Sequence, residues 1–486
     1  MSLFVGLDVG TQGCKAVVYD DRLHQVVSRG SYPYDILKSK VPGRAEQHPS
    51  LWIEGGFSAM KAALSAVDPK KVKGIGISGQ QHGFVPLDKQ GGVIRNAKLW
   101  CDVESAPEAR DLSKKWSWTL VPGFTASKIL WLKNNEPDNW AKLANVALPH
   151  DYFNYYLTGR LCMECGDASG TGVFDTANRV FDKERMSSID SSLHTFFPDL
   201  IGPNDVVGTL RPEVAESLGL SKDVQVAPGS GDNQMSALGS GAVREGLWVM
   251  SLGTSGTLFG ATKQPILDPS GGVSPFCSTD GQWLPLLCTM NCTTVTEEAR
   301  RAFGMDHATI TPLAEEQEPG CDGVNFLPYI TGERTPNWPN STGVLSGLRP
   351  GSLKPGVVYR AALEGATYSL LRGLKLMEAY GVSAEELRLV GGGSKNPLWR
   401  RIIADSFQLP IRFPVEPESA ALGGALQAAA VYNQEPVADY ITAHEPGTTD
   451  EVVEPNPSNK QKYEEAYERH VKYGEALFEN TGAGKV

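Results

Sequence analysis

A short glycine turn that occurs twice, half a chain apart, limits the possible folds of this sequence more strongly than any other feature. Residues 10–13 read Gly-Thr-Gln-Gly and residues 253–256 read Gly-Thr-Ser-Gly, an offset of 243 in a chain of 486 residues. Apolar runs flank both turns, at 3–8, 15–19, 246–252 and 257–261. Apolar runs joined by glycine turns predict β-hairpins. A hairpin that restarts at mid-length predicts two similar lobes with a cleft between them.

The remaining sequence alternates predicted strands and helices, which is typical of an α/β protein. After a third apolar run at 25–34, Ser50 opens an amphipathic helix that leads to a buried strand at 72–78. A chain of this length exceeds one ordinary core. We therefore expect a first lobe of residues 1–244 and a second of residues 245–486.

The C-terminal region is expected on the surface. Residues 446–457 are rich in Pro, Glu and Thr, and they precede a predicted polar helix at 460–479.

Charge and cysteine content exclude several classes of function. The formal net charge is −11 and no basic run occurs, which argues against nucleic acid or an anionic membrane as partner. The chain shows neither a basic-then-apolar leader nor an apolar stretch of membrane-spanning length. Cys162 and Cys165 form the one close cysteine pair, without the second pair that a zinc site needs. We expect a cytoplasmic protein with unligated thiols.

The two glycine turns are candidate phosphate-binding loops. Turn amides and Thr or Ser hydroxyls can cradle phosphate oxygens, and glycine lets the backbone come close to a ligand. Either turn alone is better explained as an ordinary hairpin, but two at equivalent places favour binding of a polyphosphate from both sides. Asp8 precedes the first turn, whereas Ser251 stands at the matching place before the second. A single acid beside phosphates is what a Mg²⁺ site needs, directly or through water.

A third glycine cluster is a candidate adenosine site. Neither the P-loop nor the dinucleotide-binding signature occurs in the chain. Residues 391–394, Gly-Gly-Gly-Ser, follow a predicted strand at 387–390 and precede a helix with Pro397 in its first turn. A strand–glycine–helix junction suits an adenosine or its phosphate. The small-residue helix that starts at Ala420 is either the other wall of this site or a closely packed element.

Asp232 is the candidate catalytic base. It stands in Pro-Gly-Ser-Gly-Asp-Asn at 228–233, after a predicted strand at 224–227 and before a helix. The local pattern also fits a helix N-cap, for which Asp is among the preferred residues. Phosphoryl transfer to a sugar needs a carboxylate that orients the hydroxyl and takes its proton.

Two other predicted strand ends carry polar side chains suited to sugar hydroxyls. Gln81 and His82 follow the strand at 72–78, and Trp100 and Asp102 follow a strand at 97–99. Amide, imidazole and carboxylate groups at strand ends commonly hold such ligands. A structural role for His82 and a core position for Trp100 are the alternatives.

These motifs, in this order, resemble the FGGY carbohydrate kinases over nearly the whole chain. Residues 8–15 and 251–256 resemble the two phosphate motifs of that family, 123–131 a family signature, and 391–394 its adenosine motif. Within the family, the segments at 79–83, 99–102, 122–125, 148–152 and 327–336 are most similar to the xylulose kinase branch. The resemblance implies a two-lobed actin-like ATPase (ribonuclease H-like) fold, with ATP and sugar bound in the interlobe cleft.

The resemblance also implies a reaction and a set of site residues. The expected reaction is ATP-dependent phosphorylation of a ketopentose, D-xylulose, to D-xylulose 5-phosphate, with Mg²⁺ present and Asp232 as the base. Asp8 would be the metal-side acid, and a homodimer is common in the family. The implied sugar contacts are Gln81, His82, Trp100, Asp102, Asp232 and Asn233. The implied ATP contacts are Gly10, Thr11, Gln12, Lys15, Gly253, Thr254, Ser255, Gly392, Gly393, Ser394 and Asn396.

Two alternatives stay open at this stage. Gln81 and Glu104 depart from some bacterial xylulose kinases, which have Met and Arg there, so ribulose, glycerol or another polyol could be the acceptor. An ATPase of the actin or heat-shock type would use the same two phosphate hairpins without a sugar.

Overall fold

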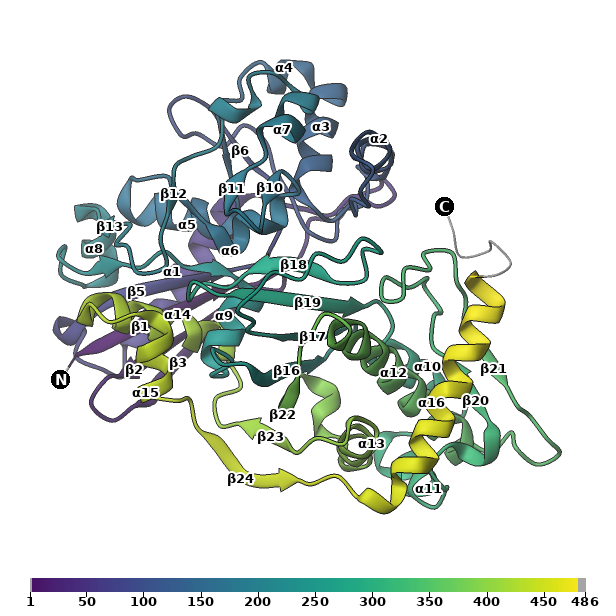
Figure 1. The fold of residues 1–486 in the computed structure, drawn as a ribbon. Helices are drawn as coiled ribbons and strands as arrows, with labels where there is room; N and C mark the ends of the chain where they lie inside the picture. The colour runs from purple at the N-terminus through teal and green to yellow at the C-terminus, as the bar shows by residue number, and fades with distance from the viewer. Residues whose placement is uncertain (1, 480–486) are drawn as a thin grey trace.

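Two seven-stranded sheets form the two halves of the molecule in the computed structural model, which describes residues 2–479 (Figure 1). The first sheet contains β1 (Leu3–Val9), β2 (Gly13–Asp20), β3 (Gln25–Pro33), β5 (Val72–Gly79), β13 (Gly208–Thr209), β14 (Gln225–Val226) and β15 (Ser230–Gly231). The second contains β16 (Gly246–Leu252), β17 (Gly256–Gly260), β18 (Ser274–Cys277), β19 (Trp283–Thr289), β22 (Ala384–Val390), β23 (Ile411–Pro414) and β24 (Thr448–Val453).

The two sheets share one core topology. In the first, β1, β2 and β3 form an antiparallel meander, and β5 and then β14 continue parallel to β1. In the second, β16, β17 and β19 form the meander, and β22 and then β23 continue parallel to β16. The hairpin predicted to restart at mid-length is confirmed. The strands of the first sheet all precede residue 244 and those of the second all follow it, while the domain division at that residue stays a prediction.

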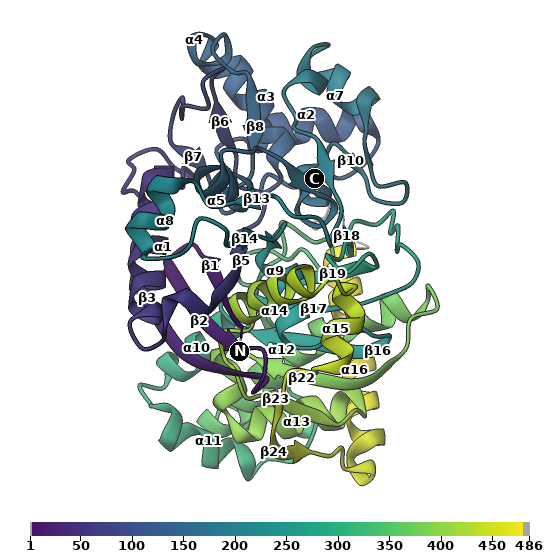
Figure 2. The ribbon, with the colours of Figure 1, turned by 90° about the vertical axis from the view of Figure 1, so that its left-hand side faces the viewer.

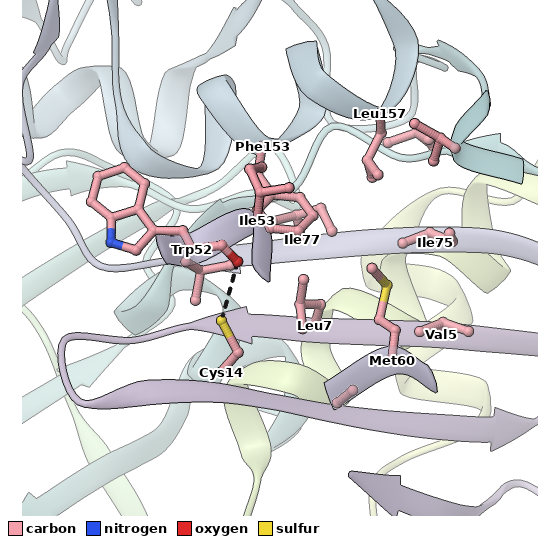
Figure 3. Close-up of a cluster of buried hydrophobic side chains, with 14 of the residues drawn as sticks. Val5, Leu7, Cys14, Trp52, Ile53, Met60, Ile75, Ile77, Phe153 and Leu157 are labelled. Atoms are coloured by element: carbon pink, nitrogen blue, oxygen red, sulfur yellow. Dashed lines mark hydrogen bonds between the residues drawn. The ribbon is translucent and has the colours of Figure 1, made fainter. Parts of the chain in front are cut away.

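Large apolar side chains fill one face of the first sheet (Figure 3). Helix α1 (Pro49–Leu64) contributes Trp52 and Met60, which recur at helical spacing on its buried side. Helix α5 (Pro149–Thr158) adds Phe153, which lies near Ile77 of β5. The Cys14 thiol donates to the backbone carbonyl of Trp52 over 3.7 Å (Figure 3). Strand β1 is almost continuously buried because helices cover its other face as well.

Helix α14 (Ser419–Asn433) covers that other face, although it comes from the second half of the chain. It packs against β1, β5 and α9 (Asp232–Gly239). A Cβ added at Gly6 would lie 1.7 Å from the Ala421 carbonyl oxygen, and one at Gly76 would lie 2.0 Å from that of Gly424. The glycines therefore allow helix and strand backbones to touch. The structure therefore shows close packing, which was one of the two interpretations of this small-residue helix.

An insertion between β5 and β14 forms a separate cap, which lies at the top of the view in Figure 2. Its strands are β6 (Val85–Leu87), β7 (Ala97–Lys98), β8 (Asn145–Ala147), β9 (Met163–Glu164), β10 (Phe174–Asp175), β11 (Val180–Phe181) and β12 (Leu200–Ile201). Its other helices are α2 (Ala106–Trp116), α3 (Thr125–Asn135), α4 (Pro137–Trp140), α6 (Cys165–Ala168) and α7 (Lys183–Ile189). Its core continues into Phe259 and Phe276 of the second sheet, so the cap bridges the two halves.

The remaining elements surround the sheets. They are β4 (Glu46–Gln47), α8 (Pro212–Leu218), α10 (Thr293–Ala302), α11 (His307–Glu315), β20 (Asn325–Leu327), β21 (Val344–Ser346), α12 (Pro355–Glu378), α13 (Pro397–Phe407), α15 (Val437–Ala443) and α16 (Lys460–Gly474). Among residues 2–479, no helix combines the length and the apolar character that crossing a membrane requires.

The C-terminal region lies at the surface as predicted, but it is more closely integrated into the fold than the sequence suggested. Part of the Pro/Glu/Thr-rich stretch forms β24, which pairs with β23 at the edge of the second sheet. Its polar side chains suit a half-exposed edge strand, so apolar alternation could not reveal it. The terminal helix α16 buries Tyr463, Ala466 and His470 and packs against α12 and α13.

Candidate active site

Three neighbouring parallel strands of the first sheet end at one edge. Register pairs Asp8 of β1 with Ser78 of β5, and Ser230 of β15 with the same Ser78. Gln81 and Asp232 follow directly where β5 and β15 end. Because the carboxyl ends of parallel strands meet at the same edge, residues separated by more than two hundred positions come together there.

A cavity of about 190 Å³ lies over this edge, and residues of the second half of the chain contribute to its lining. Its lining residues are Gln81, His82, Trp100, Val121, Gly123, Phe124, Asp232, Asn233, Ser255, Thr257, Ser274, Phe276, Leu286, Cys288 and Arg334. The volume suits a ligand smaller than a drug-sized molecule, and the wall mixes aromatic faces with a few polar groups. Among the described lining residues, all the predicted sugar contacts occur except Asp102.

Asp232 is the first residue of α9, and Gly231 occupies the N-cap position that the alternative interpretation gave to Asp232. The Asn233 amide donates to Asp232 Oδ1 over 2.9 Å and to Gln81 Oε1 over 2.8 Å. Burial, with the neighbouring charges of Asp8 and Asp167, raises the Asp232 pKa to about 8. A carboxyl group that titrates near neutral pH in a cavity suits general base catalysis.

Asp8 lies between this cavity and the first glycine turn. The Ser78 hydroxyl donates to Asp8 Oδ1 over 2.8 Å. Burial raises the Asp8 pKa to about 6, and the positive charge of Lys15, which pairs with Glu418 at 2.8 Å, opposes this rise. A carboxylate with one neutral hydroxyl as its side-chain donor is a chemically suitable ligand for a hard divalent cation.

Both glycine turns form tight hairpins with defined backbone hydrogen bonds. In the first, the Gly10 amide donates to the Gly13 carbonyl over 3.0 Å; Gln12 is exposed, and the half-exposed Lys15 pairs with Glu418. In the second, the Gly253 amide donates to the Ser255 carbonyl over 3.1 Å. Ser255 also lines the 190 Å³ cavity, so the second turn borders it directly.

A larger cavity of about 760 Å³ lies in the second half beside the third glycine cluster. Its lining residues are Thr293, Thr296, Glu297, His307, Ala308, Thr311, Pro312, Glu315, Tyr359, Gly392, Gly393, Lys395, Asn396, Pro397 and Trp399. The register of Ser251 with Val390 places this cluster next to the second glycine turn. Its size and its position match an adenosine site.

The predicted adenosine residues occupy different places around this cavity. Gly392, Gly393 and Asn396 line it, and Asn396 also caps α13 by accepting from the Leu398 amide over 3.0 Å. The Ser394 hydroxyl instead donates to the Gly391 carbonyl over 2.7 Å. Helix α14, the other candidate wall, contributes no residue to the described lining.

Several lining residues were missed from the sequence. The walls from α10 and α11, including Glu297, Thr311 and Pro312, belong to helices whose sequence shows ordinary amphipathic character and no motif. Arg334 lies in a segment noted for its resemblance but not assigned to the site, and it brings a cation to the sugar-sized cavity. The one signal in the sequence that could have identified Arg334 was its position in a segment rich in glycine and proline.

His82 is held in a restricted conformation at the cavity wall. Its φ is 61°, in the left-handed region that few non-glycine residues adopt. The buried Lys128 ammonium donates to the His82 carbonyl over 3.1 Å, and Phe124 packs against the ring at 4.7 Å between centroids. Burial holds the His82 pKa well below its ordinary value, so the ring is neutral. Such strain, held by surrounding contacts, is a common property of functional sites.

Asp102 lies away from the cavity in a buried ionic cluster. Its carboxylate accepts from the Ala45 amide over 2.8 Å and pairs with the Lys98 ammonium at 3.3 Å. The same ammonium lies 2.6 Å from Glu104, which also pairs with Arg44 at 2.7 Å. Direct contact between Asp102 and a sugar stays a prediction.

Sequence comparisons match the two halves of the chain to one family. Residues 3–239 match the N-terminal domain of the FGGY family of carbohydrate kinases, and residues 248–432 match its C-terminal domain. The xylulose kinase of Haemophilus influenzae is 37% identical over 98% of this chain and 100% of its own length. The xylulose kinase of Streptomyces coelicolor is 38% identical over 90% of this chain and 89% of its own.

Solved structures agree with the fold. The crystal structure of a xyloylose kinase from Brucella ovis superposes with a TM-score of 0.92 at 32% identity and covers 98% of this chain and 99% of that chain. Plasmodium falciparum glycerol kinase, at 20% identity, superposes with a TM-score of 0.85 over 97% of this chain and 98% of that chain, and shares the fold. The expected two-lobed α/β sugar-kinase fold is confirmed.

Proposed function

Because the chain belongs to the FGGY family of carbohydrate kinases, we propose that it transfers the γ-phosphoryl group of ATP to the terminal hydroxyl of D-xylulose. The products are D-xylulose 5-phosphate and ADP. Full-length relatives named as xylulose kinases support this acceptor. The observation that carries the proposal is the 190 Å³ cavity, where Asp232 and Asn233 face Ser255 of the second glycine turn.

Asp232 acts as the general base in a single in-line displacement. Its carboxylate accepts the proton of the terminal sugar hydroxyl while the hydroxyl oxygen forms a bond to the γ-phosphorus. The bond from that phosphorus to the bridging oxygen breaks, and ADP leaves with the electron pair. No phosphoenzyme forms. Gln81, His82, Trp100 and Asn233 orient the sugar, so the reacting hydroxyl meets the phosphate in a defined geometry.

The two glycine turns hold the phosphates, and the 760 Å³ cavity holds adenosine. Backbone amides and the hydroxyls of Thr11, Thr254 and Ser255 donate to phosphate oxygens. Asp8 fits a Mg²⁺ ligand, directly or through water, because its carboxylate lies beside the first turn with one neutral donor. Bound Mg²⁺ supplies neutralisation of the charge that develops on the phosphates.

The cysteines bear on the proposed location of the protein in the cell. All eight cysteines are unpaired thiols, which fits the reducing cytoplasm predicted from the sequence. Family resemblance favours a homodimer, which light scattering after size-exclusion chromatography would test.

The first test is coupled ADP release with ATP–Mg²⁺ and a panel of acceptors: D-xylulose, D-ribulose, L-ribulose, L-xylulose, glycerol and none. Selective turnover with D-xylulose is the expected result. Preference for another acceptor would keep the kinase mechanism and reject the proposed sugar. Turnover that does not depend on a sugar would favour an ATPase of the actin or heat-shock type.

A further inference from the structure

We propose that Trp100 is a positioning residue that couples the sugar cavity to the first phosphate hairpin through its indole N–H. The inference rests on the proposed function, since it assumes that a sugar fills the 190 Å³ cavity and that ATP phosphates contact the hairpin. Trp100 then has two roles, because its face contacts the sugar and its N–H fixes the Thr11 hydroxyl.

The starting observation is one hydrogen bond between the two sites. Trp100 lines the cavity and is 41% exposed. Its Nε1, the single donor of an indole, donates to Thr11 Oγ1 over 2.9 Å. An exposed indole usually donates to water, yet this one reaches a residue 89 positions earlier in the chain, inside the first glycine turn.

Thr11 is tied into the protein on its other side as well. Its hydroxyl donates to Gln80 Oε1 over 3.0 Å, and the buried Gln80 amide donates to Gln47 Oε1 over 3.1 Å. The Gln47 amide in turn donates to the Thr11 carbonyl over 2.8 Å. The hydroxyl has only one hydrogen, so a phosphate oxygen must compete with Gln80 for it. The indole N–H occupies a lone pair of the hydroxyl oxygen and holds that oxygen in place during the exchange.

The segment that carries Trp100 is anchored on both sides of it. On one side, the fully buried Lys98 ammonium lies 3.8 Å from the centre of the Trp131 ring. On the other, Asp102 pairs with Lys98 and accepts from the Ala45 amide. These contacts of Lys98 and Asp102 anchor the short segment that carries the indole. Asp102 therefore helps to position Trp100, a role that a buried side chain can have without contacting the sugar.

Coupling follows from this geometry. A sugar that packs against the indole restricts its remaining motion and strengthens its bond to Thr11, which orders the hairpin for phosphate. By linkage, ATP that orders the hairpin strengthens sugar binding by the same factor. The phosphate site is therefore completed when an acceptor is present, which limits transfer to water.

The test is the coupling factor, defined as the ratio of the Kd of a non-hydrolysable ATP analogue without D-xylulose to its Kd with D-xylulose, measured by titration calorimetry. Trp100→Phe keeps an aromatic face and removes the donor, and we expect the coupling factor to fall by about five-fold, the worth of one hydrogen bond. Trp116→Phe is the matched control, because the Trp116 indole donates to the Ser188 hydroxyl over 2.8 Å in the cap. This control should keep the wild-type factor.

A double-mutant cycle separates the proposed bond from general damage. Thr11→Val removes the hydroxyl, and once it is gone Trp100→Phe should lower the coupling factor no further, whereas Thr11→Ser should retain coupling. The proposal is overturned if Trp100→Phe leaves the factor unchanged, if the losses of the two variants multiply, or if wild-type protein shows no coupling. Wild-type turnover with D-xylulose, measured on the same preparation, tests the proposed function separately. If another acceptor is the substrate, the cycle is run with it.

Discussion

The two glycine hairpins have the same backbone plan but different surroundings. Each joins the first two strands of a mixed sheet, and each closes with a hydrogen bond inside the turn. The first is preceded by Asp8, and its Thr11 bonds to Trp100 at the sugar-sized cavity. The second has Ser251 at the matching place, and its Gly253 carbonyl accepts from the Thr293 hydroxyl over 2.8 Å, at the wall of the larger cavity.

This difference shows how a repeated unit acquires distinct roles. The repeated fold supplies two hairpins that we propose hold phosphates, while side chains just outside the turns differ between them. Asp8 precedes the first hairpin, and burial together with the charge of Asp8 raises the pKa of Asp232. The second hairpin accepts from the Thr293 hydroxyl beside the adenosine-sized cavity, and its Ser255 also lines the sugar-sized cavity. Four predictions test this division, in decreasing order of effect.

The largest effect should come from removing the base of the first half. Asp232→Asn preserves shape and the contact with Asn233 but cannot accept a proton, so turnover should fall by about 100- to 10,000-fold. Steady-state ADP release measures the loss, and calorimetry with an ATP analogue should show nearly unchanged binding, because the cavity proposed for adenosine lies in the other half. Turnover within a few-fold of wild type would remove Asp232 from the mechanism.

Making the first hairpin resemble the second should produce the next largest effect. Asp8→Ser installs the residue that stands at the matching place, and the apparent affinity for Mg²⁺ should weaken by about 10- to 100-fold because a carboxylate ligand is lost. Turnover as a function of Mg²⁺ concentration measures it. Ser251→Ala is the matched control in the second half and should leave the Mg²⁺ dependence unchanged. Equal shifts in the two variants would contradict the asymmetry.

A moderate effect on stability is expected from the adenosine glycines of the second half. A Cβ added at Gly393 would lie 2.7 Å from the Trp399 ring and 2.8 Å from Leu252 Cβ, whereas one at Gly392 would meet no atom within 4 Å. Gly393→Ala should therefore lower the free energy of unfolding by about 1–3 kcal/mol, and Gly392→Ala should not. Urea denaturation without ligand measures both. A destabilised Gly392→Ala variant would show that the cavity wall is packed differently.

The smallest effect is a pH-dependent gain in stability on removing Asp232. Its pKa lies near 8 in the fold against an ordinary value of 3.8, so the folded state binds the proton more tightly than the unfolded state. The free energy of unfolding should therefore fall as pH rises between these two values. Asp232→Asn lacks this loss, and its Tm should exceed that of wild type by more at pH 8 than at pH 5. Differential scanning fluorimetry without ligand measures both Tm values. If the variant and the wild type differ by the same Tm at pH 5 and at pH 8, the pKa of Asp232 is not raised.

Local signals in the sequence were sufficient for the hairpins and the strand ends. Glycine turns between apolar runs specify hairpins wherever they occur, so β1, β2, β16 and β17 lie within a residue or two of their predicted bounds. Gln81 and Asp232 could be grouped because both follow buried parallel strands. In each of these cases a few adjacent residues determine the structure.

What the sequence could not reveal depends on contacts between distant segments. Arg334 and Ser274 reach the sugar-sized cavity from segments whose path is set by tertiary packing, and the walls from α10 and α11 carry no motif. The sugar contact of Asp102 stays a prediction, and its carboxylate pairs with Lys98, four residues earlier in the chain, a contact that the sequence did not indicate. The spacing of residues along a loop does not by itself determine which way a side chain points.

The placement of α14 also affects how the chain can be made. The helix that covers β1 and β5 is synthesised some four hundred residues after β1, so the first sheet leaves the ribosome with its glycine-lined face bare. That face lacks its covering helix until residue 433 has been added, and a chain that exposes such a surface during synthesis is prone to aggregate. A fragment that stops at the middle of the chain would lack α14 and leave this surface uncovered.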